Sequence, residues 1–429
     1  MESTIKECRE EPAKPLADLP LWSRDFSLVI IGQVFSIFGN MVLSFALALY
    51  ILDISESAAM FGLVSGLPYI SLIIMTPIGG IMADRLKKQR IMFWLDVATT
   101  AIIVLYMAVS GLFEAAVPIV LVKLLALNAI QGMYIPAVQA GVPLLVSSDK
   151  LTSGNAAVGV VNTFSSMAGL SVAGILYGRF GLFPILIASA ICFAVTAIMD
   201  LFIRIPYKKQ AASGTIAQII KADMHESIRF AVKEKPILAK TAVIAFLIVM
   251  FLTAILLVGF PVLITQHLGL NMELVGINQS IIMLGGLFGG ITAGIMGSKL
   301  TMSKSFTFVA ISSIYIISIG LVVLLDVPSI PAYIIMTAAG TLVMIKVQLF
   351  NTAAITFVQK ETPSELVGKV LSMLMILPFL ANAFGMLIFG ALLEQFASIT
   401  WIIIFVNAFF IAAIAIFSRK YFKVPDIKR

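Results

Sequence analysis

The residues of this chain that can do chemistry are polar groups inside long uncharged stretches. Gln33, Ser36, Asn40 and Ser44 follow spacings that place them on one face of a helix whose other faces are apolar. Amides and hydroxyls are costly in lipid, so such a face should meet water, a solute or another helix. The stripe is therefore either part of a solute path or a source of hydrogen bonds between helices.

Two lysines also interrupt apolar stretches. Lys123 lies near one end of its stretch, so it can either extend to the membrane interface or face a cavity. Lys346 lies about twelve residues, or roughly 18 Å, from the end of its stretch, beyond the reach of a lysine side chain. We expect Lys346 to face a cavity and bind an anionic group or oppose a proton site. The polar residues on the opposite helical face should then pack on neighbouring helices; they are Thr337, Thr341, Gln348, Asn351 and Thr352.

Carboxylates that could carry protons are scarce in these stretches. Asp96 is the one that we place well inside a stretch, shortly after Arg90. We expect Asp96 to pair with the basic loop around Arg90, and a role as proton carrier is the alternative. Asp53 follows the polar stripe at the end of the first stretch and is a second coupling candidate, with solvation in a loop as its alternative.

The chain lacks the residue combinations that enzymes use. It has two histidines, two distant cysteines at positions 8 and 192, and no clustered carboxylates within the stretches. We therefore expect no metal site, no disulfide and no nucleophile paired with a base. A glycine-rich turn ending in Gly-Lys-Ser/Thr is also missing, which argues against an intrinsic nucleotide site. We expect neither an enzyme nor a bound cofactor.

The stretches that hold these residues have the length and composition of membrane-spanning helices. Hydrophobic residues make up 60% of the 429 residues and charged residues only 12%, unlike a water-soluble domain. A helix crosses a bilayer with about 20 apolar residues, and the stretches lack the alternation of a transmembrane barrel. We predict an all-α membrane protein with twelve spans, at residues 26–52, 57–83, 91–113, 124–148, 151–178, 180–199, 241–266, 274–298, 305–325, 330–358, 370–393 and 395–418.

Basic residues predict the orientation of the spans. If the amino terminus is cytoplasmic, every lysine and arginine except Lys123, Arg179 and Lys346 falls in a cytoplasmic segment, as the positive-inside rule requires. We therefore expect a multi-pass protein of the bacterial cytoplasmic membrane with both termini inside. The net charge of +7 reflects this topology and attraction to anionic lipid, and it does not indicate a nucleic-acid partner. Because the amino terminus is acidic, we do not expect it to be a cleavable signal peptide.

An internal repeat predicts two halves. The segment 80–86 (GIMADRL) matches the segment 294–300 (GIMGSKL), half the chain length away, which indicates duplicated membrane halves. We predict a tail at 1–25, a six-helix half at 26–203, a cytoplasmic linker at 204–240, a second half at 241–418 and a tail at 419–429. Within the linker we expect a short amphipathic helix around 216–232, most simply a solvated basic surface helix.

This arrangement resembles the major facilitator superfamily, whose signature loop between the second and third helices is similar to Gly80, Asp84, Arg85, Lys88 and Arg90. Lys87 stands where that family usually has glycine. The resemblance implies two pseudo-symmetric six-helix halves and transport by alternating access. We hypothesise that Asp84 latches one conformation of the halves.

Weaker motifs point to one branch of the family. Gln131-Gly132 resembles the end of its fourth-helix motif, but Asn128 replaces the arginine that the family links to proton coupling. Gly169, Gly174 and Gly178 resemble a glycine motif associated with antiporters, with Leu170 in place of proline. Gly385 and Gly390 repeat the spacing of Gly169 and Gly174, and we expect all four to pack helices. The segments 134–155 and 359–370 resemble the branch with macrolide-efflux and siderophore-export proteins.

The resemblance implies which residues should meet the solute. In the family the first, fourth, seventh and tenth helices line the cavity, so the candidates here are Gln33, Asn40, Lys123, Asn128, Gln131 and Lys346. We expect a monomeric secondary transporter that exports a drug-like or siderophore-like molecule in exchange for protons or another coupling ion. An importer of a small solute, or a lysophospholipid carrier, is the alternative.

Overall fold

The computed structural model describes residues 21–110, 117–147, 150–206, 228–363 and 367–422. Twelve helices among these residues are long and apolar enough to cross a membrane, as predicted. The N-terminal set is α1 (Arg24–Ser55), α2 with α3 (Ala58–Gly66 and Pro68–Arg85), α4 (Lys88–Ser110), α5 (Val117–Leu145), α6 (Leu151–Phe180) and α7 (Leu182–Phe202). The C-terminal set is α9 (Pro236–Ala254, continued through α10, Phe260–Val262), α11 (Met272–Met296), α12 (Met302–Leu324), α13 (Ser329–Glu361), α14 (Val367–Gln395) and α15 (Thr400–Tyr421).

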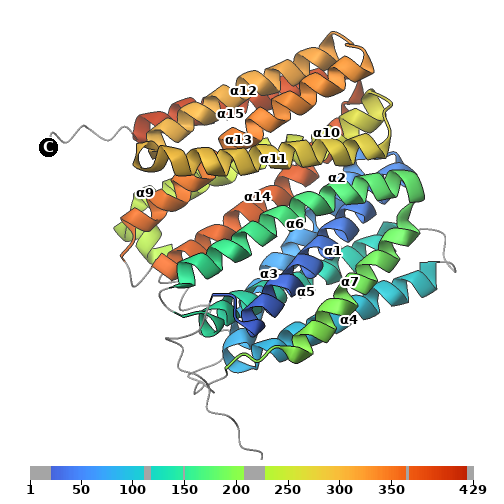
Figure 1. Ribbon diagram of the computed structural model, residues 1–429. Helices are drawn as coiled ribbons and strands as arrows, with labels where there is room; N and C mark the ends of the chain where they lie inside the picture. The colour runs from blue at the N-terminus through green and yellow to red at the C-terminus, as the bar shows by residue number, and fades with distance from the viewer. Residues whose placement is uncertain (1–20, 111–116, 148–149, 207–227, 364–366, 423–429) are drawn as a thin grey trace, which may run out of the picture.

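The two sets form pseudo-symmetric six-helix halves that lie side by side (Figure 1). The pairing α3 with α5, α4 with α7 and α1 with α6 is repeated as α11 with α13, α12 with α15 and α9 with α14. We call the end of the bundle at which α1 begins and α15 ends the termini face, and the opposite end the far face. The expected linker helix at 216–232 lies mostly outside the described residues.

Two predicted spans are less regular than the sequence indicated. The second span is broken at Leu67 into α2 and α3, since Pro68 begins a new helix at a position that needs no backbone N–H. The seventh span contains two π-helical turns, Ile255–Gly259 and Leu263–His267. Such turns disturb the backbone ladder, and Gln279 of α11 donates a hydrogen bond of 2.8 Å to the Leu256 carbonyl there.

The two halves touch at paired glycines near the far face. A Cβ atom on Gly174 of α6 would lie 2.3 Å from the Cα of Gly276 in α11, and a Cβ on Gly390 of α14 would lie 3.0 Å from the Cα of Gly62 in α2. Helix backbones are therefore in direct contact at both crossings, which only small residues allow.

Gly169 and Gly385 occupy equivalent places within the separate halves. Gly169 packs on Met41 of α1, and Gly385 packs on Met250 of α9. Each half thus uses one glycine to hold its first helix and another, further along the same helix, to contact the other half. This repetition follows from the pseudo-symmetry of the fold.

Polar contacts between the halves accompany the glycine crossings. The hydroxyls of Ser171 and Ser280 are hydrogen-bonded, and Arg179 forms an ion pair of 2.7 Å with Glu273. On the other side, Glu394 accepts hydrogen bonds from the Ser57 hydroxyl and from the Ala59 backbone N–H. These residues lie from mid-height to the far face. The Arg179 side chain is 60% exposed, so its ion pair should contribute little, and backbone packing is the main contact.

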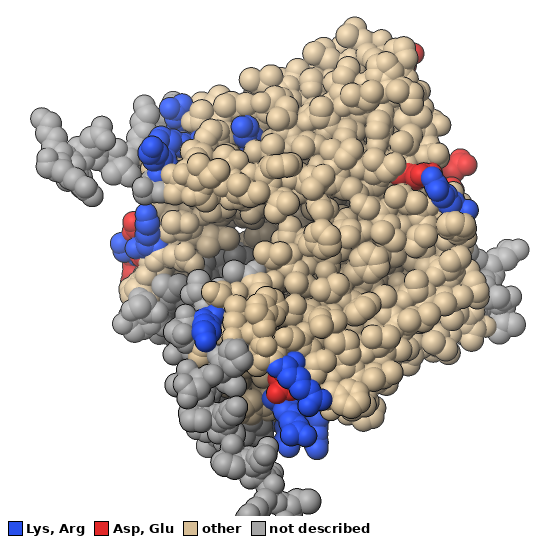
Figure 2. All heavy atoms as spheres, viewed as in Figure 1, with Lys and Arg blue, Asp and Glu red and all other residues tan. Residues whose placement is uncertain are grey.

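The termini face carries most of the positive charge that is visible in Figure 2. Most of the lysine and arginine side chains in this view lie at that end, with a few acidic side chains among them, whereas the far end shows acidic side chains beside a smaller basic group. The surface between the halves is also hollowed toward the termini face (Figure 2). The termini end of the seam is therefore the more basic end, and it is hollowed.

Replacing Gly174 with alanine should loosen the far end of the seam. The added methyl group has no space beside Gly276, and overpacking costs about 1–3 kcal/mol, enough to change a two-state balance by roughly fivefold or more. In a protein whose native cysteines are replaced by serine, we expect a cysteine at Met283 to react faster with an impermeant maleimide added at the far face.

Gly159→Ala is the matched control, because Gly159 lies on the same helix and a Cβ there would meet nothing within 4 Å. Equal labelling rates in the two alanine variants would contradict the assigned role of the glycine crossing.

Candidate functional site

A cavity of about 650 Å³ lies at mid-height in the seam between the halves. It is bounded by α6 on one side and by α11 and α13 on the other, on the termini side of the Ser171–Ser280 contact. Its lining combines amides and hydroxyls with methionine and aliphatic side chains: Asn162, Thr163, Ser166, Met283, Gly286, Leu287, Gly290, Ile291, Met344 and Gln348. Such a mixed, adaptable wall suits an organic molecule with both polar and apolar parts.

Glycines on two faces of α11 create room for this cavity. Gly285 and Gly289 pack against the backbone of α13, near Thr341 and Ile345. Gly286 and Gly290 border the cavity, where a Cβ on Gly290 would meet only Gln348, at 4.0 Å. Close packing on one face therefore fixes α11 against α13 and leaves the adjacent face without side chains.

The structure places Gln348, and not Lys346, at the cavity. The Lys346 ammonium lies 5.4 Å from the ring centroid of Phe308 in α12, and Lys346 does not line the seam cavity. Part of the opposite face packs on α11 as expected, since Thr337 accepts a hydrogen bond of 2.8 Å from Asn278. The helical spacing separated the two faces of α13, but it did not decide which face meets the cavity.

The polar stripe of α1 is buried inside the N-terminal half in this conformation. Gln33 is 5% exposed and Asn40 is 6% exposed, and neither lines the seam cavity. The helix packs closely on α7, where Ser189 donates a hydrogen bond of 3.3 Å to the Gly39 carbonyl. The amide nitrogen of Gln33 and the hydroxyl of Ser44 have no hydrogen-bond partner among the described residues, so both interpretations of the stripe stay open.

Lys123 and Asp53 are brought to a group of tyrosines near the far face. Lys123 is 4% exposed, and its ammonium lies 3.8 Å from the ring centroid of Tyr106; it does not extend to the interface. The Tyr177 hydroxyl donates a hydrogen bond of 2.8 Å to Asp53, and its ring lies 6.5 Å from that of Tyr50. Asp53 and Tyr177 also border a hollow of about 720 Å³ at the far face, whose other wall includes Thr265 and Gln266 of the C-terminal half. This far-face hollow is separate from the seam cavity.

The expected pair of Asp96 with the basic loop is wrong. Asp96 is 2% exposed, and its carboxyl lies beside that of Asp200 on α7. Sequence reasoning missed Asp200 because a charged residue was taken as the end of the sixth span. The apolar residues that follow it, Leu201 and Phe202, are the signal that the helix continues.

The remaining candidates do not converge on the cavity. Gly80 and Gly294 lie near the termini ends of α3 and α11, and a Cβ would meet nothing within 4 Å at either one. The side chain of Asp84 lies outside the described residues. Arg85 and Lys88 are partly buried and Arg90 is exposed, while Asn128 donates a hydrogen bond of 3.0 Å to the Leu124 carbonyl of its own helix and Gln131 is partly buried.

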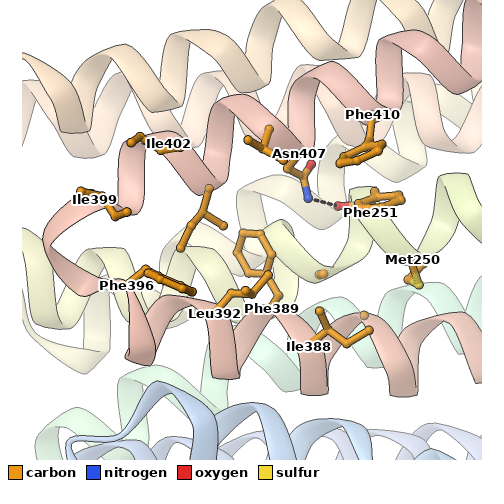
Figure 3. A pocket seen from close by; sticks show the side chains of 14 residues that line it. Met250, Phe251, Ile388, Phe389, Leu392, Phe396, Ile399, Ile402, Asn407 and Phe410 are labelled. Carbon is orange, nitrogen blue, oxygen red and sulfur yellow. Dashed lines mark hydrogen bonds between the residues drawn. The ribbon is translucent and has the colours of Figure 1, made fainter.

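A second cavity, of about 330 Å³, lies within the C-terminal half between α9, α14 and α15 (Figure 3). Its wall is formed by phenylalanines and aliphatic side chains, several of them exposed, including Ile388 and Phe410. The one amide in the wall, Asn407, donates a hydrogen bond of 3.1 Å to the Phe251 carbonyl. This cavity lacks the polar groups of the seam and does not meet the N-terminal half.

A doubled helical bundle with a mixed cavity at its seam defines a class of protein: a multi-pass membrane transporter, and not an enzyme. A model of the Major Facilitator Superfamily matches residues 29–377, and the chain belongs to this superfamily. Macrolide efflux protein A of Streptococcus pyogenes is 21% identical over 383 residues, which are 89% of this chain and 93% of that protein.

Solved transporters share the fold. The nucleoside transporter NupG aligns with a TM-score of 0.73 and 13% identity, over 94% of this chain and 100% of that one. A bacterial homologue of the human lysosomal transporter Spinster, in an inward-facing and unoccupied conformation, aligns with a TM-score of 0.72 and 14% identity, over 94% and 98% of the two chains. At such identities the likeness shows the fold alone.

The geometry of α13 predicts that Gln348→Leu will impair transport more than Lys346→Met. Loss of one neutral hydrogen bond to a bound solute corresponds to about 0.5–1.5 kcal/mol, or roughly a two- to tenfold rise in KM. Transport kinetics in proteoliposomes measure this difference. Thr292→Val on α11 is the control, because the exposed Thr292 hydroxyl bonds to the Phe288 carbonyl of its own helix. A larger effect of Lys346→Met would reverse the assignment of the two faces.

Proposed function

We propose that this protein exports a partly apolar, drug-like organic molecule across a bacterial cytoplasmic membrane in exchange for protons. The seam cavity, positioned between the glycine crossings near the far face and the hollowed termini end (Figure 2), is the observation that carries the proposal. It is the geometry of a carrier that has one side open and moves its solute by rocking two halves about a midplane site. In this proposal the monomer is the working unit.

The charge distribution supports a cytoplasmic termini face. Basic residues are retained on the cytoplasmic side during membrane insertion, and in Figure 2 they gather at the termini end. With this orientation the cavity faces the cytoplasm, and the glycine crossings close the outer side. An exporter in this conformation is ready to collect its cargo from the cell interior or from the inner leaflet.

The cavity wall supports an organic cargo of intermediate polarity. Met283 and Met344 can adapt to an irregular apolar surface, while Asn162 and Gln348 offer donors and acceptors that fix its orientation. No lysine, arginine, aspartate or glutamate is among the described residues that line the cavity, so a strongly charged cargo is disfavoured. The similarity to a macrolide efflux protein over most of both chains supports the same class of cargo.

Accumulation in bacteria lacking their own efflux pumps tests this function. We expect cells that make the protein to hold several-fold less of a fluorescent macrolide than cells with an empty vector. The difference should vanish when an uncoupler dissipates the proton gradient, because the gradient supplies the energy for export.

Everted membrane vesicles determine the direction. An imposed inside-acid gradient should drive macrolide into such vesicles, since their cytoplasmic face points outward. Uptake of solute into intact cells down the proton gradient would instead favour an importer, and proton-independent movement of lysophospholipid between leaflets would favour a lipid carrier.

A further inference from the structure

Two carboxyl groups are buried together in the N-terminal half, away from the seam cavity. Asp96 of α4 is 2% exposed and Asp200 of α7 is 1% exposed. Their carboxyls lie beside each other where α4 packs on α7. A contact of this kind between two carboxylates has no hydrogen to share unless one of them is protonated.

No basic group is among the described groups that act on these carboxyls. Asp96 Oδ2 and both carboxyl oxygens of Asp200 are buried without a hydrogen-bond partner among the described residues. Buried charges are normally paired with a basic group or a metal. Among the described groups, the charged neighbour of Asp96 is Asp200, and the charged neighbour of Asp200 is Asp96.

Other charged groups on the surrounding helices lie elsewhere. Asp25 accepts a hydrogen bond of 3.1 Å from the Arg204 backbone N–H. Arg85 ends α3 and is partly buried, and Arg90 belongs to the first turns of α4 and is exposed. Arg179 pairs with Glu273 near the far face. The uncharged Tyr134 of α5 is also near the carboxyl pair.

Tyr134 is buried between this pair and polar groups of α1. The Tyr134 hydroxyl of α5 lies close enough to both carboxyls to interact with them and also approaches Ser36 and Gln33 of α1. Tyr134 is 3% exposed, and its hydroxyl has no hydrogen-bond partner among the described residues; the same is true of the amide nitrogen of Gln33, whose side chain is 5% exposed. Gln33 and Ser36 of the polar stripe therefore lie near the carboxyl pair through Tyr134.

The C-terminal half shows that the fold itself does not require this polar group. Its equivalent helices are α12, α13 and α15, and near the termini face they meet around Phe306, Phe350 and Phe422. The ring of Phe306 lies 5.8 Å from that of Phe350 and 5.2 Å from that of Phe422. Where one half has packed rings, the other half holds two acids, and this difference points to a function.

We propose that Asp96 and Asp200 bind one shared proton, and that this is the proton exchanged for cargo. The exchange of this proton for cargo rests on the proposed function. On release, the O–H bond of the protonated carboxyl breaks and the proton passes to water, which leaves two carboxylates that repel each other in an apolar core. Their repulsion separates α4 from α7, and Tyr134 transmits the change to α1. A metal is disfavoured, because no group of three His, Cys, Asp or Glu side chains occurs among the described residues.

Infrared difference spectroscopy of the purified full-length protein tests the shared proton. A pH titration should reveal the carbonyl stretch of one protonated carboxyl that shifts in D₂O and is altered in both Asp96→Asn and Asp200→Asn. Asp326→Asn is the control, because Asp326 lies in an exposed turn with φ +48°, which asparagine also tolerates. A spectrum without such a band, or a band that survives both substitutions, would overturn the proposal, as would a Na⁺-dependent change that replaces the band at constant pH.

Proteoliposomes test the coupling separately. We expect Asp96→Asn and Asp200→Asn to reduce transport driven by a pH gradient at least tenfold, while exchange of labelled for unlabelled cargo at equal pH stays within about twofold. That exchange also shows that the variants fold. If proton-driven transport persists in both variants, the coupling site is wrong and the proposed function stands. If the unsubstituted protein exports without using the gradient, export in exchange for protons is rejected as its function. The infrared band then decides by itself whether Asp96 and Asp200 bind a proton.

Discussion

Direct contact between helix backbones at paired glycines is the constraint on which the rest of the structure depends. Lipid provides no hydrophobic force to hold two helices together, so packing must do so. At Gly174–Gly276 and Gly62–Gly390 the two halves approach so closely that a single methyl group would separate them. Both crossings lie toward the far face, where they hold the two halves in direct contact. The cavity beneath them exists because the halves diverge from these contacts toward the termini face.

The two halves share one architecture but differ in chemistry. The N-terminal half holds the buried ionisable groups, with Lys123 beside Tyr106 and Asp96 beside Asp200. The C-terminal half contributes packed phenylalanines, π-helical turns in the seventh span and most of the cavity wall. In the proposed mechanism one half senses the proton, both halves hold the cargo, and the glycine crossings transmit the change between them.

The sequence predicted the helices and the duplication well, because apolar length and the repeat at 80–86 and 294–300 are direct consequences of bilayer thickness and gene doubling. Side-chain surroundings were harder to predict. Helical spacing separated Lys346 from Gln348 but could not fix the rotation of α13 about its axis, which depends on Gly285 and Gly289 of another helix. Asp200 was missed because a charged residue was read as the end of a span. The partner of Asp96 depends on tertiary packing, which local pattern does not encode.

The most direct test of alternation is a pair of distances measured by electron paramagnetic resonance in lipid. One pair of spin labels, at Val160 and Ile295, spans the seam on the termini side, and another, at Phe183 and Leu325, spans it at the far face; all four side chains are exposed. As pH and cargo are varied, the first distance should shorten while the second lengthens. Two distances that stay constant, or that change in the same direction, would contradict a carrier whose halves rock about the seam.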